Sequence, residues 1–261
     1  MNPLLDPESR LVIAHRGASA ERPENTLESF RLALEQGADA LELDVRATAD
    51  GEVVVVHDAT LERTTSLAGF VRGRTVAELR AADAGARFTP DAGRTFPWRG
   101  RDVRVPTLAD VLDAFPGVPL LVEVKEPAAQ EPTRRAILDA GAQARCVLAS
   151  AHADALVAFR EAPFLRGASG ADISRLYFPA MLGFAPAALE ALAFAVPLRW
   201  RGLTIPTRRV VAAARRRGRP VHVWTVDEPA IALRLWERGV AGIVTNVPGR
   251  IAAARSGARG G

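Results

Sequence analysis

Short apolar runs alternate with segments of helical period along most of the chain. We predict eight strands, over residues 11–15, 40–46, 120–125, 146–150, 165–169, 202–206, 221–226 and 242–246. Helices are expected between them, over residues 26–36, 107–114, 131–140, 152–160, 186–194, 207–217 and 228–238. Because apolar runs joined by helical crossovers are typical of parallel sheets, this order predicts an α/β fold. Eight strands favour closure into a (β/α)₈ TIM barrel over an open doubly wound sheet.

The length of the chain suits such a barrel. Its 261 residues are close to the roughly 250 that one (β/α)₈ domain needs. We therefore expect a single domain over residues 1–261. No G-x-G-x-x-G follows the first predicted strand, which removes the main argument for a dinucleotide-binding fold.

Residues 53–57 form a further apolar run, which lies too close to strand 40–46 for a parallel crossover. Asp50 and Gly51 provide a hairpin turn, so this run is expected to return antiparallel and to bring His57 near the barrel mouth. From about residue 59 to 105 the period is lost among Gly, Pro, Arg and Thr. We interpret this stretch as a small insertion that caps the C-terminal face of the barrel.

Composition and charge limit the classes of binding partner that the protein is expected to have. The net charge is +4, but no basic stripe is interleaved with aromatic residues, so no nucleic-acid partner is expected. No apolar run precedes Leu11, so we predict neither a signal nor a membrane span. A cytoplasmic location without stable membrane association is therefore expected. Cys146 is the only cysteine and cannot form an internal disulfide, and no feature indicates an oligomeric state.

Carboxylates recur with strand spacing at two predicted strand ends. Glu42 and Asp44 stand two residues apart and so point to the same face, and Glu123 and Lys125 repeat this geometry. Adjacent ionised carboxylates repel unless a proton or a cation is shared between them. Three oxygen ligands suit one hard divalent ion, Ca²⁺ or Mg²⁺. The alternative is a solvent-exposed strand with paired charges. Lys125 is the only lysine among 34 basic residues.

Two of the four histidines fall at predicted strand ends. His15 ends the first strand and His57 ends the hairpin, where each imidazole is a candidate acid or base, although a single histidine there could equally be a packed core residue. Asn25, followed three residues later by Glu28, fits the N-cap of the first helix and would place a polar edge beside the site. Trp224 would form a flat apolar wall or pack in the core.

Together these motifs resemble one family, the glycerophosphodiester phosphodiesterases. The resemblance covers about residues 11–248 and rests on His15-Arg16-Gly17, Pro23-Glu24-Asn25-Thr26, Glu42-x-Asp44, Asp50-Gly51, His57-Asp58, Glu123-x-Lys125 and Trp224-Thr225-Val226. Two departures stand out, since Ser150-Ala151 replaces the family's Ser-Phe and Thr245-Asn246 replaces its Thr-Asp.

The resemblance implies a metal-dependent phosphoric diester hydrolase that converts glycerophosphodiesters to sn-glycerol 3-phosphate and an alcohol. It implies that Glu42, Asp44 and Glu123 hold the metal and that His15 and His57 are the acid and base. Substrate-binding roles are expected for Arg16, Glu24, Asn25, Lys125 and Trp224.

Two alternatives remain open at the level of the sequence. One is a phospholipase D-like lyase that acts on lysolipids and releases a cyclic phosphate, and the other is a catalytically silent phosphodiester-binding barrel. Because the chain lacks a basic amphipathic helix, we expect a small-molecule glycerophosphodiester substrate rather than a lipid aggregate.

Overall fold

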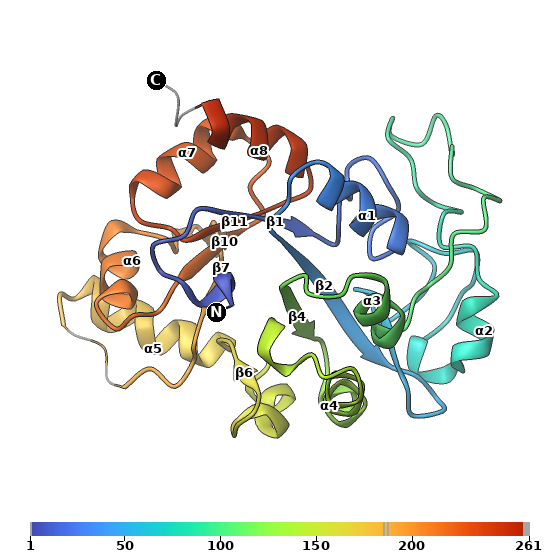
Figure 1. Ribbon diagram of the computed structural model, residues 1–261, viewed down its shortest axis with the longest axis horizontal. Coiled ribbons are helices and arrows are strands. Elements are labelled where there is room, and N and C mark those ends of the chain that lie inside the picture. The colour runs from blue at the N-terminus through green and yellow to red at the C-terminus, as the bar shows by residue number, and fades with distance from the viewer. Residues whose placement is uncertain (1, 185, 187, 258–261) are drawn as a thin grey trace.

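Parallel strands of a curved sheet form the centre of the molecule, and helices surround them (Figure 1). The computed structural model describes residues 2–184, 186 and 188–257. The strands of the sheet follow the order β6-β5-β4-β2-β1-β11-β10-β7. Their bounds are β1 Leu11–His15, β2 Ala40–Ala47, β4 Leu120–Val124, β5 Cys146–Ala149, β6 Leu165–Arg166, β7 Phe194–Pro197, β10 Val221–Trp224 and β11 Gly242–Thr245.

Backbone hydrogen bonds beside the two end strands join the β6 region to the residues just before β7 and close the ring. The amide of Leu192 donates to the carbonyl of Arg166 at 2.8 Å, and that of Ala168 donates to Ala193 at 2.9 Å. Eight strands thus enclose a barrel interior, which confirms the predicted α/β class and (β/α)₈ TIM barrel.

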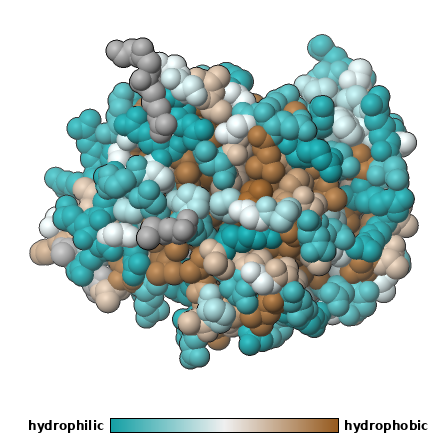
Figure 2. All heavy atoms as spheres, viewed as in Figure 1, coloured by the Kyte–Doolittle hydropathy of each residue, from teal (hydrophilic) through white to brown (hydrophobic). Residues whose placement is uncertain are grey.

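Helices cover the outside of the barrel (Figure 1). They are α1 Leu27–Glu35, α2 Val76–Arg80, α3 Leu108–Ala114, α4 Gln130–Asp139, α5 Gly170–Met181, α6 Arg208–Arg215, α7 Pro229–Glu237 and α8 Pro248–Gly257. Short 3₁₀ turns are η1 Pro3–Leu5, η2 Val71–Gly73, η3 Pro127–Ala129, η4 Gln143–Arg145 and η5 Ala153–Phe159. Figure 2 shows hydrophilic side chains over much of the periphery and hydrophobic ones mostly between the elements. No described helix is long and apolar enough to cross a membrane.

Apolar side chains fill the lower barrel and close its floor. Leu11, Ile13, Val147 and Val244 belong to one buried cluster inside the strands. Leu4 of η1 joins this cluster and is fully buried. His222 of β10 is a buried polar residue beside this floor, where its Nε2 lies 2.9 Å from the carbonyl of Leu4, while the charged side chains gather at the opposite end of the barrel, where the strands end.

The hairpin prediction is confirmed, because β3 (Val53–Val55) pairs antiparallel with β2 and places Val45 opposite Val55. Gly51 adopts the left-handed conformation, with φ of 77°, that this turn requires. Beyond the hairpin, the helical elements of residues 59–105 are the short η2 and α2, and Leu61, Val71 and Leu79 pack in a small cluster with Val54 and Val56 of the hairpin.

Three local predictions are wrong. The first concerns residues 202–206, which do not enter the barrel: β9 (Leu203–Thr204) pairs with β8 (Arg199–Trp200) in a separate two-stranded hairpin. The barrel strand at this point is β7, whose Phe194 is fully buried, so burial outweighed the helical period predicted over 186–194. Residue 187 of that predicted helix lies outside the described residues.

The second wrong prediction is an omission, since α5 was not expected. Gly170 begins it and Pro179 lies within it, and both residues disfavour helix in a sequence pattern. The third concerns the start of α1. Thr26, not Asn25, is its N-cap, and the Thr26 hydroxyl accepts from the amide of Ser29 at 3.3 Å.

Candidate active site

Three carboxylates meet where β2 and β4 end. Strand register places Asp44 opposite Glu123, and Glu42 lies two residues earlier on the same face of β2. One carboxylate oxygen from each residue lies within 4.8 Å of the others. Burial, followed by repulsion from Asp44 and Glu123, raises the pKa of Glu42 well above its usual value. The cluster therefore favours a shared proton or cation.

Protein cations offset part of this negative charge. Asp44 is fully buried, and its carboxylate lies 3.0 Å from Nε of Arg16 and 3.2 Å from Nζ of Lys125. The amide Nδ2 of Asn25 donates to Asp44 Oδ2 at 2.9 Å. Burial opposes ionisation, but Lys125 and Arg16 lower the pKa of Asp44 below its usual value. Asp44 is thus held as a carboxylate.

The donor set fits a hard divalent cation. All three ligands are carboxylates, which Ca²⁺ and Mg²⁺ prefer. Asp44 Oδ1 is buried, and it accepts no hydrogen bond from the described residues although Lys125 lies at ion-pair distance. An orphaned buried oxygen beside two further carboxylates is the arrangement that a bound cation satisfies.

His15 ends β1 beside this cluster, and its ring is oriented from behind. Nδ1 of His15 lies 2.7 Å from the side-chain oxygen of Asn246. That oxygen also accepts from the hydroxyl of Ser19 at 2.8 Å, while the Asn246 Nδ2 donates to Asp227 at 2.8 Å. This network assigns the proton to Nδ1 of His15 and leaves Nε2 as an acceptor. Burial and then Arg16 lower the pKa of His15, against the opposing contact of Asn246.

His57, just beyond β3, has a different partner. Its Nδ1 lies 2.6 Å from Oδ1 of Asp58, so the ring is paired with a carboxylate rather than an amide. The guanidinium of Arg63 bonds the other oxygen of Asp58. Burial raises the pKa of Asp58, but Arg63 and His57 outweigh this effect and lower that pKa to about 2. The two histidines thus have different partners: the ring of His57 is paired with the carboxylate of Asp58, and the ring of His15 with the neutral side chain of Asn246.

A strained loop between β1 and α1 places Arg16. Arg16 and Asn25 both adopt left-handed backbone, with φ of 56° and 58°, and the amide of Asn25 donates to the carbonyl of Arg16 at 3.0 Å. Gly17, which follows Arg16 in this loop, packs against α1, and no larger residue fits there because a Cβ atom would lie 2.3 Å from Oγ of Ser29. Such strain is commonly retained where it orients functional groups.

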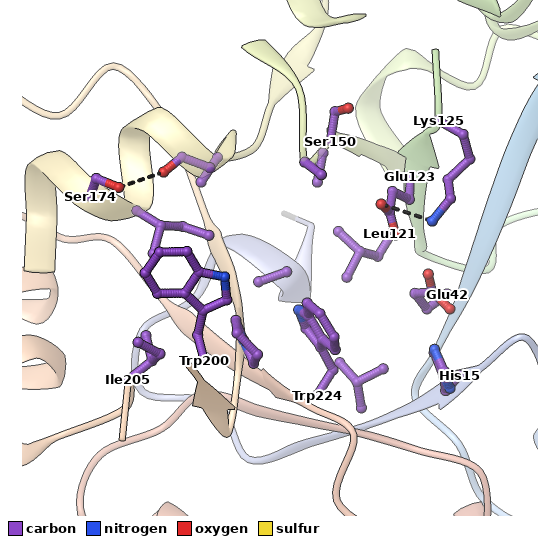
Figure 3. Close-up of a pocket in the computed structure, with 18 of the residues that line it drawn as sticks. His15, Glu42, Leu121, Glu123, Lys125, Ser150, Ser174, Trp200, Ile205 and Trp224 are labelled. Atoms are coloured by element: carbon purple, nitrogen blue, oxygen red, sulfur yellow. Dashed lines mark hydrogen bonds and ion pairs between the residues drawn. The ribbon is translucent and has the colours of Figure 1, made fainter. Parts of the chain in front are cut away.

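A cavity of about 500 Å³ opens above the carboxylates. Its polar end is lined by His15, Arg16, Glu42, His57, Glu123 and Lys125. Figure 3 shows His15, Glu42 and Lys125 on one side, Trp200 and Ile205 on the other, and Trp224 between them. Of the described residues that line the cavity, none belongs to the segment 59–105.

Most of the predicted site residues line this cavity, but Glu24, Asn25 and Asp44 lie behind its wall. Glu24 bonds Arg16 at 3.0 Å and receives two bonds of 2.7 Å from Arg63, so its carboxylate joins two guanidinium groups. Asn25 contacts Asp44. In this geometry Glu24 positions Arg16, which lines the cavity, and Asn25 positions Asp44 behind the cavity wall.

Sequence reasoning missed the partners of the two histidines. Asn246 and Asp227 behind His15, and Arg63 behind Asp58, had no assigned role. One signal was available for each histidine: Asn246 stands at a departure from the family pattern, and Asp58 directly follows His57. Asp227 and Arg63 have no comparable signal in the sequence.

Comparison with known proteins adds an independent line of evidence. The model of the glycerophosphoryl diester phosphodiesterase family matches residues 15–250. A glycerophosphodiester phosphodiesterase of Caldanaerobacter subterraneus subsp. tengcongensis is 34% identical over 246 residues, covering 91% of this chain and 94% of the relative.

Solved structures agree with the architecture. A glycerophosphoryl diester phosphodiesterase domain from Mycobacterium tuberculosis superposes with a TM-score of 0.81 at 22% identity, covering 95% of this chain and 99% of that domain, which shows the shared fold. An Oleispira antarctica phosphodiesterase, solved in complex with the product sn-glycerol-3-phosphate, has a TM-score of 0.73 at 26% identity and covers 94% of this chain and 96% of its own.

Proposed function

Because the chain belongs to the glycerophosphoryl diester phosphodiesterase family and is thus a phosphoric diester hydrolase, we propose that it cleaves glycerophosphodiesters to sn-glycerol 3-phosphate and an alcohol. One observation carries this proposal. Three clustered carboxylates, two cations and two separately oriented histidines lie at one end of a cavity, with Asp44 just behind its wall, and a phosphodiester cleavage needs each of these groups.

Glu42, Asp44 and Glu123 would hold one divalent cation, Ca²⁺ or Mg²⁺. When bound, it would neutralise the charge that develops on the phosphoryl oxygens. Arg16 and Lys125 supply further positive charge at the same end of the cavity. Ion pairs with Asp44 and Glu24 fix the guanidinium of Arg16, and an ion pair with Glu123 fixes the ammonium of Lys125. Both side chains therefore need little reorganisation during the reaction.

The different partners of the histidines divide their roles. His15 presents an unprotonated Nε2, so it takes the proton of the attacking water. His57, whose ring is paired with the carboxylate of Asp58, donates a proton to the departing alkoxide. The new bond joins the water oxygen to phosphorus, the bond to the alcohol oxygen breaks, and the two histidines exchange protonation states. Solvent then restores them.

A turnover assay tests this proposal. The purified chain is incubated with glycerophosphocholine and Ca²⁺ or Mg²⁺, with and without a chelator, and sn-glycerol 3-phosphate is measured. We expect release of glycerol 3-phosphate that stops with chelator and returns with added metal. Turnover that is unaffected by the chelator would contradict the metal dependence. A cyclic phosphate as the first product, seen by phosphorus NMR, would favour the lyase alternative.

A further inference from the structure

The cavity is much larger than its polar end. Its apolar half is formed by α5, by the β8–β9 hairpin with the residues after it, and by the end of β10. The side chains of this half are Ile173, Tyr177, Phe178, Trp200, Leu203 and Ile205, with Trp224 at the border. Figure 3 shows Trp200 and Ile205 across the cavity from Glu42 and His15. A volume of about 500 Å³ lies in the range for drug-sized ligands, and sn-glycerol 3-phosphate is smaller than these.

The apolar half also lacks an anionic partner for a positively charged head group. The carboxylates among the described lining residues are Glu42 and Glu123, and both lie at the polar end. Arg16 and Lys125 lie there too. A charged group placed among Ile173, Trp200 and Ile205 would therefore lose water without gaining a charged partner. An alkyl chain would lose nothing polar.

Apolar surface is concentrated at this cavity. Among the described residues, four of the large hydrophobic side chains that remain exposed line it: Phe178, Trp200, Leu203 and Trp224. Trp200 is 52% exposed and Phe178 56%. Concave, exposed apolar surface next to convergent polar groups marks a ligand site rather than incidental exposure.

We propose that the apolar half of the cavity binds one alkyl or acyl chain of the substrate, with Trp200 as its outer wall. This inference rests on the proposed function, because the phosphodiester occupies the polar end while the chain extends towards α5. Two substrate classes share this chemistry: lysophospholipids, which carry the chain on glycerol, and glycerophosphodiesters whose leaving alcohol carries it.

This differs from the sequence-based expectation of a purely water-soluble substrate. That expectation rested on the lack of a basic amphipathic helix, and it took segment 59–105 as the cap of the barrel. The cavity wall instead comes from α5 and β8–β9, where the sequence pattern was misread.

Chain-length series test the inference. kcat/KM is measured for hexanoyl, octanoyl and decanoyl lysophosphatidylcholine and for the hexyl, octyl and decyl esters of glycerol 3-phosphate, all below their critical micelle concentrations, beside glycerophosphocholine. Each buried methylene contributes up to about fourfold, so we expect at least a tenfold rise from six to ten carbons in one series. The series that rises identifies the end of the substrate that carries the chain. Equal kcat/KM at all lengths, with normal turnover of glycerophosphocholine, would overturn the inference and leave the proposed function intact.

Substitution of Trp200 tests whether this residue forms the outer wall of the apolar half. Trp200→Ala should reduce the chain-length gain at least fivefold while turnover of glycerophosphocholine stays within about twofold. Phe70→Ala is the matched control, because Phe70 is 55% exposed and does not line the cavity. An unchanged gain in Trp200→Ala would contradict the assignment of this wall.

Binding tests the inference without turnover. Calorimetric titration with decyl phosphate and ethyl phosphate should show at least tenfold tighter binding of the decyl compound by the wild type, and less preference in Trp200→Ala. Equal affinities would overturn the apolar site even if the chain had no activity on any diester.

Discussion

Nδ1 of His15 lies 2.7 Å from the side-chain oxygen of Asn246, and this contact determines which nitrogen of His15 faces the cavity. Asp227 fixes the amide by accepting from its Nδ2 at 2.8 Å. The pair joins the end of β1 to the residue that follows β11, which is the neighbouring strand. A neutral partner leaves His15 with a lowered pKa, since burial and Arg16 both disfavour its charged form.

Asn246→Asp should move the pH dependence of turnover. A carboxylate at this position would stabilise the protonated ring and raise the pKa of His15. Because a general base acts only when unprotonated, the acidic limb of kcat/KM against pH should shift upward with it. The pH–rate profile of the variant checks this. An acidic limb at the wild-type position would contradict the role of His15 as base.

Leaving-group chemistry should separate the two histidines. His57→Ala should lose about 10²- to 10⁴-fold in kcat/KM with glycerophosphocholine, because its alkoxide needs a proton. With a p-nitrophenyl ester of glycerol 3-phosphate, whose leaving group departs unprotonated, most of that loss should disappear. His15→Ala should be equally impaired with both substrates. Rescue of His15→Ala alone would reverse the two assignments.

His222 should make the fold sensitive to mild acid. Burial lowers its pKa from 6.5 to about 4, although the carbonyl of Leu4 opposes this by accepting from Nε2 at 2.9 Å. Between these values the unfolded chain binds the proton and the folded one does not, so stability falls as pH drops from about 6.5 to about 4. This contribution is of order 3 kcal/mol.

Urea unfolding at several pH values measures that slope. His222→Asn should flatten it relative to the wild type, whatever its absolute stability, whereas the exposed His152→Gln should leave it unchanged. A wild-type slope in His222→Asn would show that other groups carry the acid sensitivity.

Lys125→Arg should reduce kcat/KM by about tenfold or more. Nζ of Lys125 lies 3.2 Å from Asp44 and 3.0 Å from Glu123, and its side chain is only 12% exposed. A planar guanidinium does not fit a point-like position between two carboxylates. Arg160→Lys, an exchange at an exposed site, is the control and should match the wild type. Unaltered kinetics in Lys125→Arg would show that the site does not specifically need an ammonium group at this position.

Much of the fold could be predicted because its strands are buried on both faces. β1 and β11 are short apolar runs, and β2 and β4 are apolar runs that charged residues interrupt only at alternate positions towards their ends, so the signal does not depend on distant residues. α5 depends on tertiary packing instead: Leu176 and Tyr177 lie in one buried cluster with Val210 of α6. Its glycine and proline hid it from a propensity argument. The same region forms the apolar half of the cavity, so that half was not anticipated.

The site shows the same division. Glu42 and Asp44 were recognised because strand spacing alone places them on one face. The contact of His15 with Asn246 spans 231 positions, and no local period reports such a pairing. Glu24 and Asn25 were recognised as site residues by motif, but only the contacts with Arg16 and Asp44 show what their side chains touch.

The central claim is that Glu42, Asp44 and Glu123 hold one divalent cation, and calorimetric titration with Ca²⁺ or Mg²⁺ tests it most directly. The wild type should bind one ion per chain. The combined variant Glu42→Gln, Asp44→Asn, Glu123→Gln should bind none while retaining its circular dichroism spectrum, and Asp154→Asn, at an exposed acidic residue, should bind like the wild type. Undiminished binding of one ion by the folded combined variant would contradict the account.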